Sequence, residues 1–252
     1  MDNTFMRMEK KTTLPSSAAE ELKARIAPFV DSDPHNVDGT PYMISNLYFD
    51  GADDHVVRES VQLPSYKEKL RLRCYGTPTE DTKVFLELKK KINGVGAKRR
   101  AKLPYKDLKH YLETGLHPEG LSYEDEQVLQ EIDCYRSREA VVPHVYVSYL
   151  RNAYYGKEDP SFRLTLDSDI LTRRFDLDLA KGRYGTPILT EGTTLLEVKF
   201  TGAVPFWFSR IMSDLGLSFH TFSKVGTDFK LRAYEKACAK HPDQDHYLRL
   251  IH

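Results

Sequence analysis

The residues of this chain that could do chemistry are arginines and lysines spaced two positions apart. Arg71 and Arg73 form one such pair, and Lys89 and Lys91 form another. Arginine makes forked, charge-assisted hydrogen bonds to phosphate oxygens, and lysine acts as a mobile point charge. A surface lined by these side chains would attract a polyanion.

A few carboxylates occupy similar positions, namely Glu9, Glu87, Asp167 and Glu197. A carboxylate beside a bound anion is unfavourable unless a metal ion lies between them, and Mg²⁺ or Mn²⁺ suits both carboxylate and phosphate oxygens. Basic side chains, sparse carboxylates and a divalent metal are what phosphoryl transfer requires. Cross-strand ion pairs, such as Glu87 with Arg73, are the alternative explanation for any single residue.

Composition supports an anionic ligand. The 252 residues include 37 basic and 37 acidic side chains, so the formal net charge is zero. Between Tyr66 and Tyr111, however, 14 basic residues face 5 acidic ones, a net charge of +9. A basic stretch inside a neutral protein favours a defined anionic ligand, although a solvated face balanced by acids elsewhere would have the same composition.

The charged residues follow the period of β-strands. Lys69, Arg71 and Arg73 alternate with leucines, and the same alternation of ionic and apolar residues occurs in segments 6–11, 84–91, 162–167 and 196–200. Each of these strands has one apolar and one ionic face, because successive side chains point to opposite sides. One such strand would fit an open antiparallel sheet with a solvated face. Five favour a closed β-barrel, with the ionic faces inside and helices packed on the apolar outside.

Helices are expected where apolar residues recur at helical spacing. Ser17 and Glu20 suggest a capping box for a helix over 17–29, and Ser122 with Asp125 indicates the start of another. Further helices are predicted over 106–114, from Pro205 to Gly216, and over 228–240, and further strands over 42–49 and 145–151. Asn93-Gly94, between Lys89–Lys91 and Arg99–Arg100, predicts a hairpin turn. No repeat or linker divides the chain, so we expect one α+β domain over residues 1–252.

Several classes of protein are excluded by the sequence. The three cysteines Cys74, Cys134 and Cys238 lie far apart, which argues against a disulfide framework and a zinc site and favours the cytoplasm. No apolar run is long enough to cross a bilayer. Residues 93–98 lack the spacing of a P-loop, and the basic strands lack the interleaved aromatics of a single-strand nucleic-acid platform.

An ordered series of segments resembles the VTC domain, the polyphosphate polymerase branch of the triphosphate tunnel metalloenzyme superfamily. No single segment is diagnostic, but the series keeps the order of that family over nearly the whole chain. The matching segments are Arg7–Lys11, Ile44–Asp50, Lys69–Arg73, Val84–Lys89, Lys98–Arg100, Tyr149–Tyr154, Phe162–Asp167, Leu195–Lys199 and Phe222–Lys224.

The resemblance implies an antiparallel β-tunnel that transfers the γ-phosphate of ATP to a growing polyphosphate chain, with Mn²⁺ or Mg²⁺ as cofactor. It implies phosphate contacts from Lys11, Arg71, Arg73, Lys89, Arg151, Arg163 and Lys224. It implies that Tyr149 and Ser223 help to hold the phosphate chain, that Glu197 binds the metal, and that Glu87 is a second carboxylate. The strand and hairpin positions add Lys199, Lys91, Arg99 and Arg100 as substrate-binding residues.

The chain departs from the family pattern near its last basic position. Thr221 stands where the family often has a basic residue, and Val225 stands where it usually has an aromatic one. The 252 residues contain no SPX domain or membrane segment like those of eukaryotic members, so we expect the stand-alone bacterial form.

Two other functions remain open. A hydrolase of inorganic or nucleoside triphosphates would use the same basic walls, and no residue of the sequence is an evident water-activating base. A non-catalytic polyanion-binding module is the third possibility, but it would gain nothing from a carboxylate such as Glu197 beside the phosphates. We expect ATP and inorganic polyphosphate as ligands, with no nucleic acid and no membrane insertion.

Overall fold

A computed structural model describes residues 7–62, 64–93 and 95–240. Ten strands form one antiparallel sheet, in which eight are paired in the order β1-β10-β8-β7-β3-β4-β5-β6, while β2 pairs with β7 and β9 with β8. The strands are β1 (Arg7–Pro15), β2 (Val30–Ser32), β3 (Tyr42–Asp50), β4 (Tyr66–Tyr75), β5 (Lys83–Ile92), β6 (Val95–Pro104), β7 (Val142–Gly156), β8 (Arg163–Arg173), β9 (Thr186–Pro187) and β10 (Thr193–Thr201).

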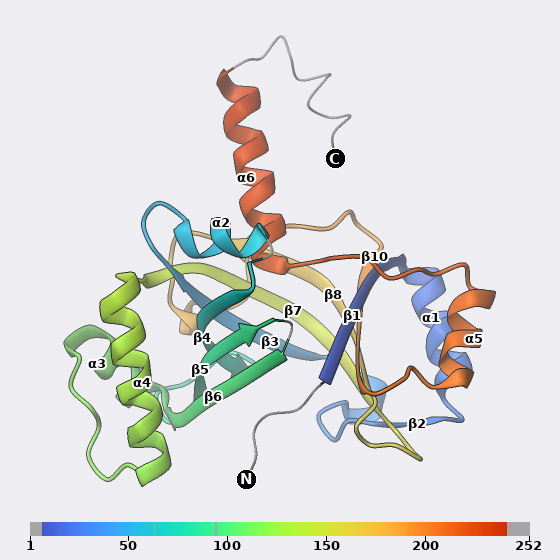
Figure 1. Ribbon diagram of the computed structural model, residues 1–252, viewed down its shortest axis with the longest axis horizontal. Helices are drawn as coiled ribbons and strands as arrows, with labels where there is room; N and C mark the ends of the chain where they lie inside the picture. The colour runs from blue at the N-terminus through green and yellow to red at the C-terminus, as the bar shows by residue number, and fades with distance from the viewer. Residues whose placement is uncertain (1–6, 63, 94, 241–252) are drawn as a thin grey trace.

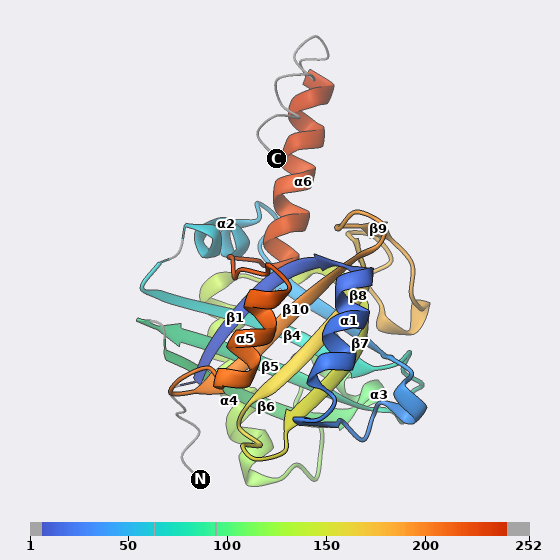
Figure 2. The ribbon, with the colours of Figure 1, turned by 90° about the vertical axis from the view of Figure 1, so that its right-hand side faces the viewer.

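Six α-helices and two short 3₁₀-helices accompany the sheet in the described residues. They are α1 (Ser16–Ile26), α2 (His55–Val61), α3 (Tyr105–Thr114), α4 (Tyr123–Glu139), α5 (Phe206–Asp214), α6 (Lys224–Lys240), η1 (Val37–Gly39) and η2 (Leu179–Lys181). Helices α3 and α4 lie outside one end of the sheet, and α1 and α5 lie outside the other end (Figure 1). Helix α6 begins near the sheet and projects away from it (Figure 2).

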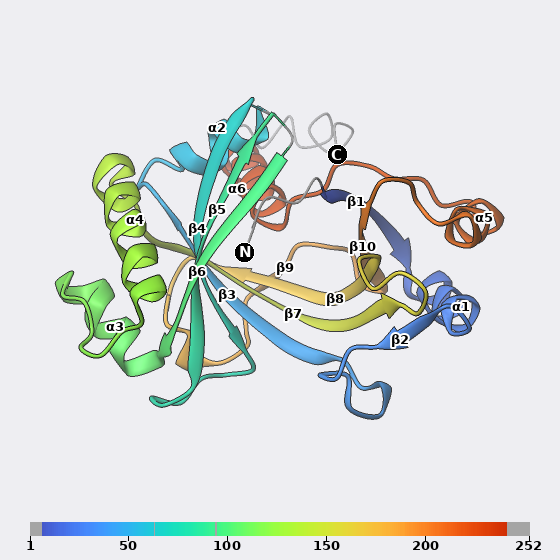
Figure 3. The ribbon, with the colours of Figure 1, turned by 60° about the horizontal axis from the view of Figure 1, so that its bottom comes forward.

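The sheet is strongly curved but does not close. Figure 3 shows β4, β5 and β6 as one wing and β8, β10 and β1 as the other. In the described residues no ladder joins β1 to β6, so the α+β prediction is confirmed, whereas the closed barrel is wrong. The free edge of β1 is met instead by the chain after α5, where the backbone N–H of His220 donates to the carbonyl of Lys11 at 2.8 Å.

Apolar side chains cover the convex face of the sheet. Leu70, Leu72 and Leu86 pack against α3 and α4 on one wing. Leu164, Leu196 and Val198 pack against α1 and α5 on the other wing. Since alternate residues of a strand point to opposite faces, packing these apolar residues under helices turns the charged residues between them toward the concave face.

Most predicted elements are present with shifted ends. The strand predicted over 6–11 extends to Pro15, while Met6 lies outside the described residues. The capping box of Ser17 is wrong, because β1 runs directly into α1 and Pro15 is the N-cap without a side-chain hydrogen bond. Ser122 does cap α4, since its side chain accepts a hydrogen bond from the backbone N–H of Asp125.

Two differences affect the charged face. The predicted hairpin is confirmed, because β5 pairs with β6 as far as Ile92 and Val95. Helix α6 begins at Lys224 rather than at 228, and the Ser223 hydroxyl accepts a hydrogen bond from the Gly226 N–H at 3.1 Å. A hydroxyl that accepts such a bond caps the helix start. Helix α2 has no counterpart among the predictions.

A buried arginine fixes the loop that follows β8. Arg173 is fully buried, and its guanidinium donates to the backbone carbonyls of Asp176, Asp178, Gly182 and Tyr184. Its guanidinium carbon also lies 3.5 Å and 4.1 Å from the ring centroids of Tyr146 and Tyr184. One side chain therefore satisfies four carbonyls of residues 176–184.

We predict that Arg173→Met lowers the free energy of unfolding by roughly 3–5 kcal/mol, because it leaves buried carbonyls without donors. Urea denaturation measures the change. Arg210→Met, at an exposed position of α5, is the matched control and should change stability by less than about 0.5 kcal/mol. Equal effects of the two substitutions would contradict the structural role of Arg173.

Candidate functional site

The candidate site is the concave face of the sheet, which carries more cations than carboxylates. Its basic residues come from β1, β4, β5, β6, β7, β8, β10 and the start of α6. They include Lys11, Lys67, Lys69, Arg71, Arg73, Lys89, Lys91, Lys98, Arg100, Arg151, Arg163, Lys199 and Lys224, while its carboxylates include Glu9, Glu87, Asp167 and Glu197.

Arg71 on β4 forms a buried ion pair with Glu87 on β5. Its Nε and Nη2 both lie 2.6 Å from Oε2 of Glu87, and its Nη1 donates to the Tyr48 hydroxyl at 3.3 Å. Burial alone would raise the pKa of Glu87, but Arg71, Arg73 and Lys98 lower it to about 2. Glu87 is therefore ionised and holds Arg71 in place.

Arg73 is the next residue on the same face and has neutral partners. Its Nε donates to Asn46 Oδ1 at 3.1 Å, and its Nη2 donates to the Tyr149 hydroxyl at 3.2 Å. Burial raises the pKa of Tyr149, but Arg151, Arg73 and Lys224 outweigh burial and lower it to about 8. The lowered pKa indicates a strongly positive environment around this hydroxyl.

A second buried acid links β7, β8 and α6. Asp167 on β8 is fully buried; it accepts hydrogen bonds from Arg151 Nε and Nη2 at 2.6 and 2.7 Å, and from Lys224 Nζ at 2.6 Å. Burial raises the pKa of Asp167, but Arg151 and Lys224 lower it below its usual value. Asp167 thus brings a strand arginine and a helix lysine to one point, beside the ring of Tyr149, which lies 4.4 Å from Lys224 Nζ.

Two further carboxylates, Glu9 and Glu197, lie together on the β1–β10 wing. Lys11 Nζ lies 2.8 Å from Glu9 and 3.5 Å from Glu197, and Lys199 contacts both acids. Burial and mutual repulsion raise the pKa of Glu9, but Lys199 and Lys11 lower it to about 2. Both acids are therefore ionised near each other. The described residues contain no group of three or more His, Cys, Asp or Glu side chains that could hold a metal by themselves.

Lys89 and Lys69 have no acid within ion-pair distance among the described residues. Repulsion from Arg71 is the main cause that lowers the pKa of Lys89 well below its usual value, with burial and Lys199 next. Burial, Lys67 and Lys11 lower the pKa of Lys69 to about 8. A charged lysine in such a place is unfavourable until an anion joins it.

Charge repulsion also acts between the two wings of the curved sheet. Lys89 on β5 is close enough to Lys199 on β10 for repulsion between them, and Lys69 on β4 is similarly close to Lys11 on β1. The residues are far apart in the sheet order, so they approach each other across the concave face. An anion bound between these lysines would be attracted by both wings.

The structure places most predicted site residues on this face, while Arg99, Glu87 and Ser223 differ from the prediction in place or in partner. Arg99 lies on the opposite face, where its Nε is 3.2 Å from Glu131 of α4, because odd and even residues of β6 alternate. Arg100 is on the concave side, 5.0 Å from the ring centroid of Phe85. Glu87 belongs to the Arg71 pair and not to the cluster of Glu197. Ser223 lies at the start of α6, where its oxygen caps the helix.

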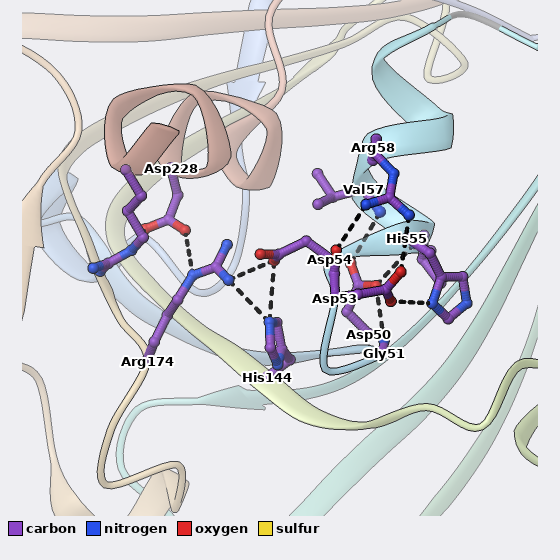
Figure 4. A network of polar contacts seen from close by, with 12 residues as sticks. Asp50, Gly51, Asp53, Asp54, His55, Val57, Arg58, His144, Arg174 and Asp228 are labelled. Carbon is purple, nitrogen blue, oxygen red and sulfur yellow. Dashed lines mark hydrogen bonds and ion pairs between the residues drawn. The ribbon is translucent and has the colours of Figure 1, made fainter. Parts of the chain in front are cut away.

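A polar network fastens α6 to the sheet (Figure 4). Asp228 accepts hydrogen bonds from Thr172 at 2.7 Å, from Arg174 Nε at 3.0 Å and from Arg232 at 3.1 Å. Arg174 also bonds Asp54 at the start of α2, and its Nη1 lies 2.9 Å from His144. The network fixes the first turn of α6 and therefore the position of Lys224.

Sequence reasoning missed several residues that shape the site. Asn46 and Tyr48 orient Arg73 and Arg71. Both lie in the segment Ile44–Asp50 that resembles the family, but no role follows for them from the sequence. Glu9 is one of the carboxylates that the sequence singles out, but its closeness to Glu197 depends on the β1–β10 register, which sets Glu9 opposite Lys199 and Glu197 opposite Lys11. Asp228 and Arg174 carried no signal at all, because their contacts join distant parts of the chain.

The chain belongs to the VTC domain family, whose model matches residues 6–231. This family is a branch of the triphosphate tunnel metalloenzyme superfamily, so the fold and the family agree. A search of curated proteins gave no match. None of the helices in the described part of the chain is long and apolar enough to cross a membrane.

Solved structures with a similar fold are distant in sequence. A candidate adenylate cyclase from Bacillus halodurans is 16% identical, with a TM-score of 0.51 over 88% of this chain and 95% of that chain. A candidate adenylyl cyclase from Hippeastrum, described as having a dominant triphosphatase activity, is 20% identical, with a TM-score of 0.49 over 87% and 93% of the two chains. At this identity the likeness to the Bacillus protein concerns the fold alone.

We predict opposite stability changes for two neighbouring cations. Lys89→Gln removes an unpaired, half-buried charge and should raise stability by about 0.5–2 kcal/mol. Arg71→Gln leaves Glu87 with Lys98 as its remaining partner and should lower stability by about 3–5 kcal/mol. Thermal unfolding of both variants measures the changes, and a destabilised Lys89→Gln protein would contradict the unpaired state of Lys89.

We predict that Arg73→Ala weakens binding of inorganic triphosphate by about 10- to 100-fold, because a charge-assisted contact to phosphate is lost. Arg99→Ala is the matched control, since Arg99 lies on the helix-covered face, and its affinity should stay within about two-fold of the wild type. Calorimetric titration at low and high salt measures both. Equal losses that vanish together in high salt would indicate diffuse surface binding instead.

Proposed function

We propose that this protein is an ATP-dependent polyphosphate polymerase that works on the concave face of its sheet. The observation that carries the proposal is the surplus of cations there, above all Lys89 and Lys69, which lack acidic partners among the described residues. A linear polyanion lying between the two wings would satisfy these charges. Membership in the VTC domain family supports the polymerase over other triphosphate enzymes.

The proposed transfer needs positioning and charge neutralisation rather than a side-chain nucleophile. An oxygen of the terminal phosphate of polyphosphate forms a bond to the γ-phosphorus of ATP, and the bond between the γ-phosphorus and the β–γ bridging oxygen breaks. ADP leaves, and the chain is longer by one phosphate. Arg71, Arg73 and Lys89 hold the transferred group, while Arg151, Arg163 and Lys224 hold neighbouring phosphates and balance their charge.

Glu197 and Glu9 are the residues that fit a divalent metal. Their ionised carboxylates are hard oxygen donors near each other, and Mg²⁺ or Mn²⁺ commonly combines one or two carboxylates with substrate phosphates and water. Such an ion, when bound, neutralises charge on the phosphates. Glu87 fits this task less well, because Arg71 and Lys98 occupy its oxygens.

The decisive experiment is incubation of the purified protein with ATP and Mn²⁺, followed by a gel for polyphosphate and an assay for free phosphate. Polyphosphate with little free phosphate supports the polymerase. Free phosphate alone identifies a triphosphatase, and tight binding without turnover of ATP identifies a binding module. The cytoplasmic location expected from the cysteines, the single domain and the specific site roles stay predictions.

We predict that Glu197→Gln lowers turnover by about two orders of magnitude while the fold survives. The matched variant is Glu87→Gln, which should lose stability because Arg71 loses its partner, without a change in the Mn²⁺ concentration needed for half-maximal activity. A titration of Mn²⁺ for each variant separates the two carboxylates. A shifted Mn²⁺ requirement in Glu87→Gln and a normal one in Glu197→Gln would assign the metal to Glu87.

A further inference from the structure

One end of the concave face carries a cluster of aromatic rings that the phosphate chemistry does not use. The rings of Tyr75 and His35 are stacked with centroids 5.1 Å apart, and Tyr42 lies 5.4 Å from His35 and 6.0 Å from Tyr75. Phe85 meets the edge of Tyr75 at 6.0 Å. These four residues, the aromatic cluster, come from β3, β4, β5 and the loop after β2.

The aromatic cluster is open to solvent and flanked by cations. Tyr75 is 40% exposed, which is unusual for a ring that serves only to fill a core. Arg100 and Lys102 lie 5.0 and 5.8 Å from the ring centroid of Phe85, and both are exposed. Neither of these cations has an acidic partner within ion-pair distance among the described residues. Exposed rings with free cations beside them suit a ligand that is both aromatic and anionic.

Along β4, the side chains on the concave face change from aromatic at one end to basic at the other. From its C-terminal end inward, the residues that share the concave face are Tyr75, Arg73, Arg71, Lys69 and Lys67. Alternate residues of a strand are about 6.6 Å apart, so Tyr75 lies about 13 Å from Arg71 along the strand. That distance is comparable to the span from the base to the terminal phosphate of an extended nucleoside triphosphate.

We infer that the aromatic cluster is a subsite for the base of the nucleoside triphosphate donor. The base packs against Tyr75 and its neighbouring rings, Arg100 and Lys102 meet the phosphate nearest the ribose, and the chain of phosphates runs along Arg73 and Arg71 toward Lys69. The inference rests on the proposed use of ATP. It adds a direction, because the donor enters at the aromatic end and the growing chain extends toward the lysine end.

The test compares two ligands that differ by the nucleoside. Affinities for ATP and for inorganic triphosphate are measured by calorimetry on the wild type, Tyr75→Ala, Tyr75→Phe and Tyr75→Leu. Stacking of a base on an aromatic ring predicts an about ten-fold loss of ATP affinity for Tyr75→Ala and Tyr75→Leu, with triphosphate affinity unchanged and Tyr75→Phe close to the wild type. The leucine variant keeps apolar contacts but has no aromatic ring, so it still tests stacking if Tyr75→Ala fails to fold.

Tyr66→Ala is the matched control. Tyr66 is also an exposed tyrosine of β4, 47% accessible, but it lies at the other end of the strand and on the opposite face. Its affinities for both ligands should match the wild type.

The outcomes separate the subsite from the function. Equal losses of ATP and triphosphate affinity in the Tyr75 variants, or no loss of either, would overturn the base subsite. Selective loss of ATP affinity in a protein that makes no polyphosphate would support the subsite and overturn the polymerase. A wild type that binds neither ligand would overturn both.

Discussion

The structure depends on the burial of surplus positive charge on the concave face of one curved sheet. Burying an unpaired cation destabilises a fold. Here buried carboxylates offset part of this cost, and apolar packing on the convex face offsets the rest. Arg71 and Arg151 have buried acids, Glu87 and Asp167, directly across from them on neighbouring strands. Lys89 has none within ion-pair distance among the described residues, and repulsion from Arg71 together with burial lowers its pKa. The apolar convex face, covered by helices, supplies the stability that makes this arrangement possible.

The carboxylates of the face therefore divide into two kinds. Glu87 and Asp167 are fully engaged with arginines and lysines, so they orient the basic side chains and lower the repulsion among them. Glu9 and Glu197 lie near each other, and their ion-pair partners among the described residues are lysines, whose flexible side chains can move away when another cation arrives. This difference in partners, rather than the number of acids, is what makes the β1–β10 wing the better place for a metal ion.

The C-terminal part of the chain completes the site from outside the sheet. Lys224 bonds Asp167, Ser223 caps α6, and Asp228 at the end of the first turn bonds Thr172 and Arg174, so these contacts together hold Lys224 at the sheet. The chain before α6 also meets the free edge of β1 at Lys11, which lies beside Glu9 and Glu197. Position along the sequence thus says little about proximity here, since residues more than 200 positions apart form one charged surface.

The strands and their ionic faces were predictable from the sequence, because alternation of Leu70 and Leu72 with Arg71 and Arg73 is a local property of a strand. For the same reason the sequence assigned most of the candidate basic residues to the face on which the structure has them. The family was predictable from the order of the matching segments. The sequence did not determine whether the sheet closes, since that depends on how β1 and β6 meet across the whole fold. It also did not tell which of the neighbours Arg99 and Arg100 faces the helices, or that Glu9 lies beside Glu197, because helix packing decides the first and strand register the second. Both depend on tertiary contacts, because the ion-pair partner of a charged side chain is the opposite charge that the fold places next to it.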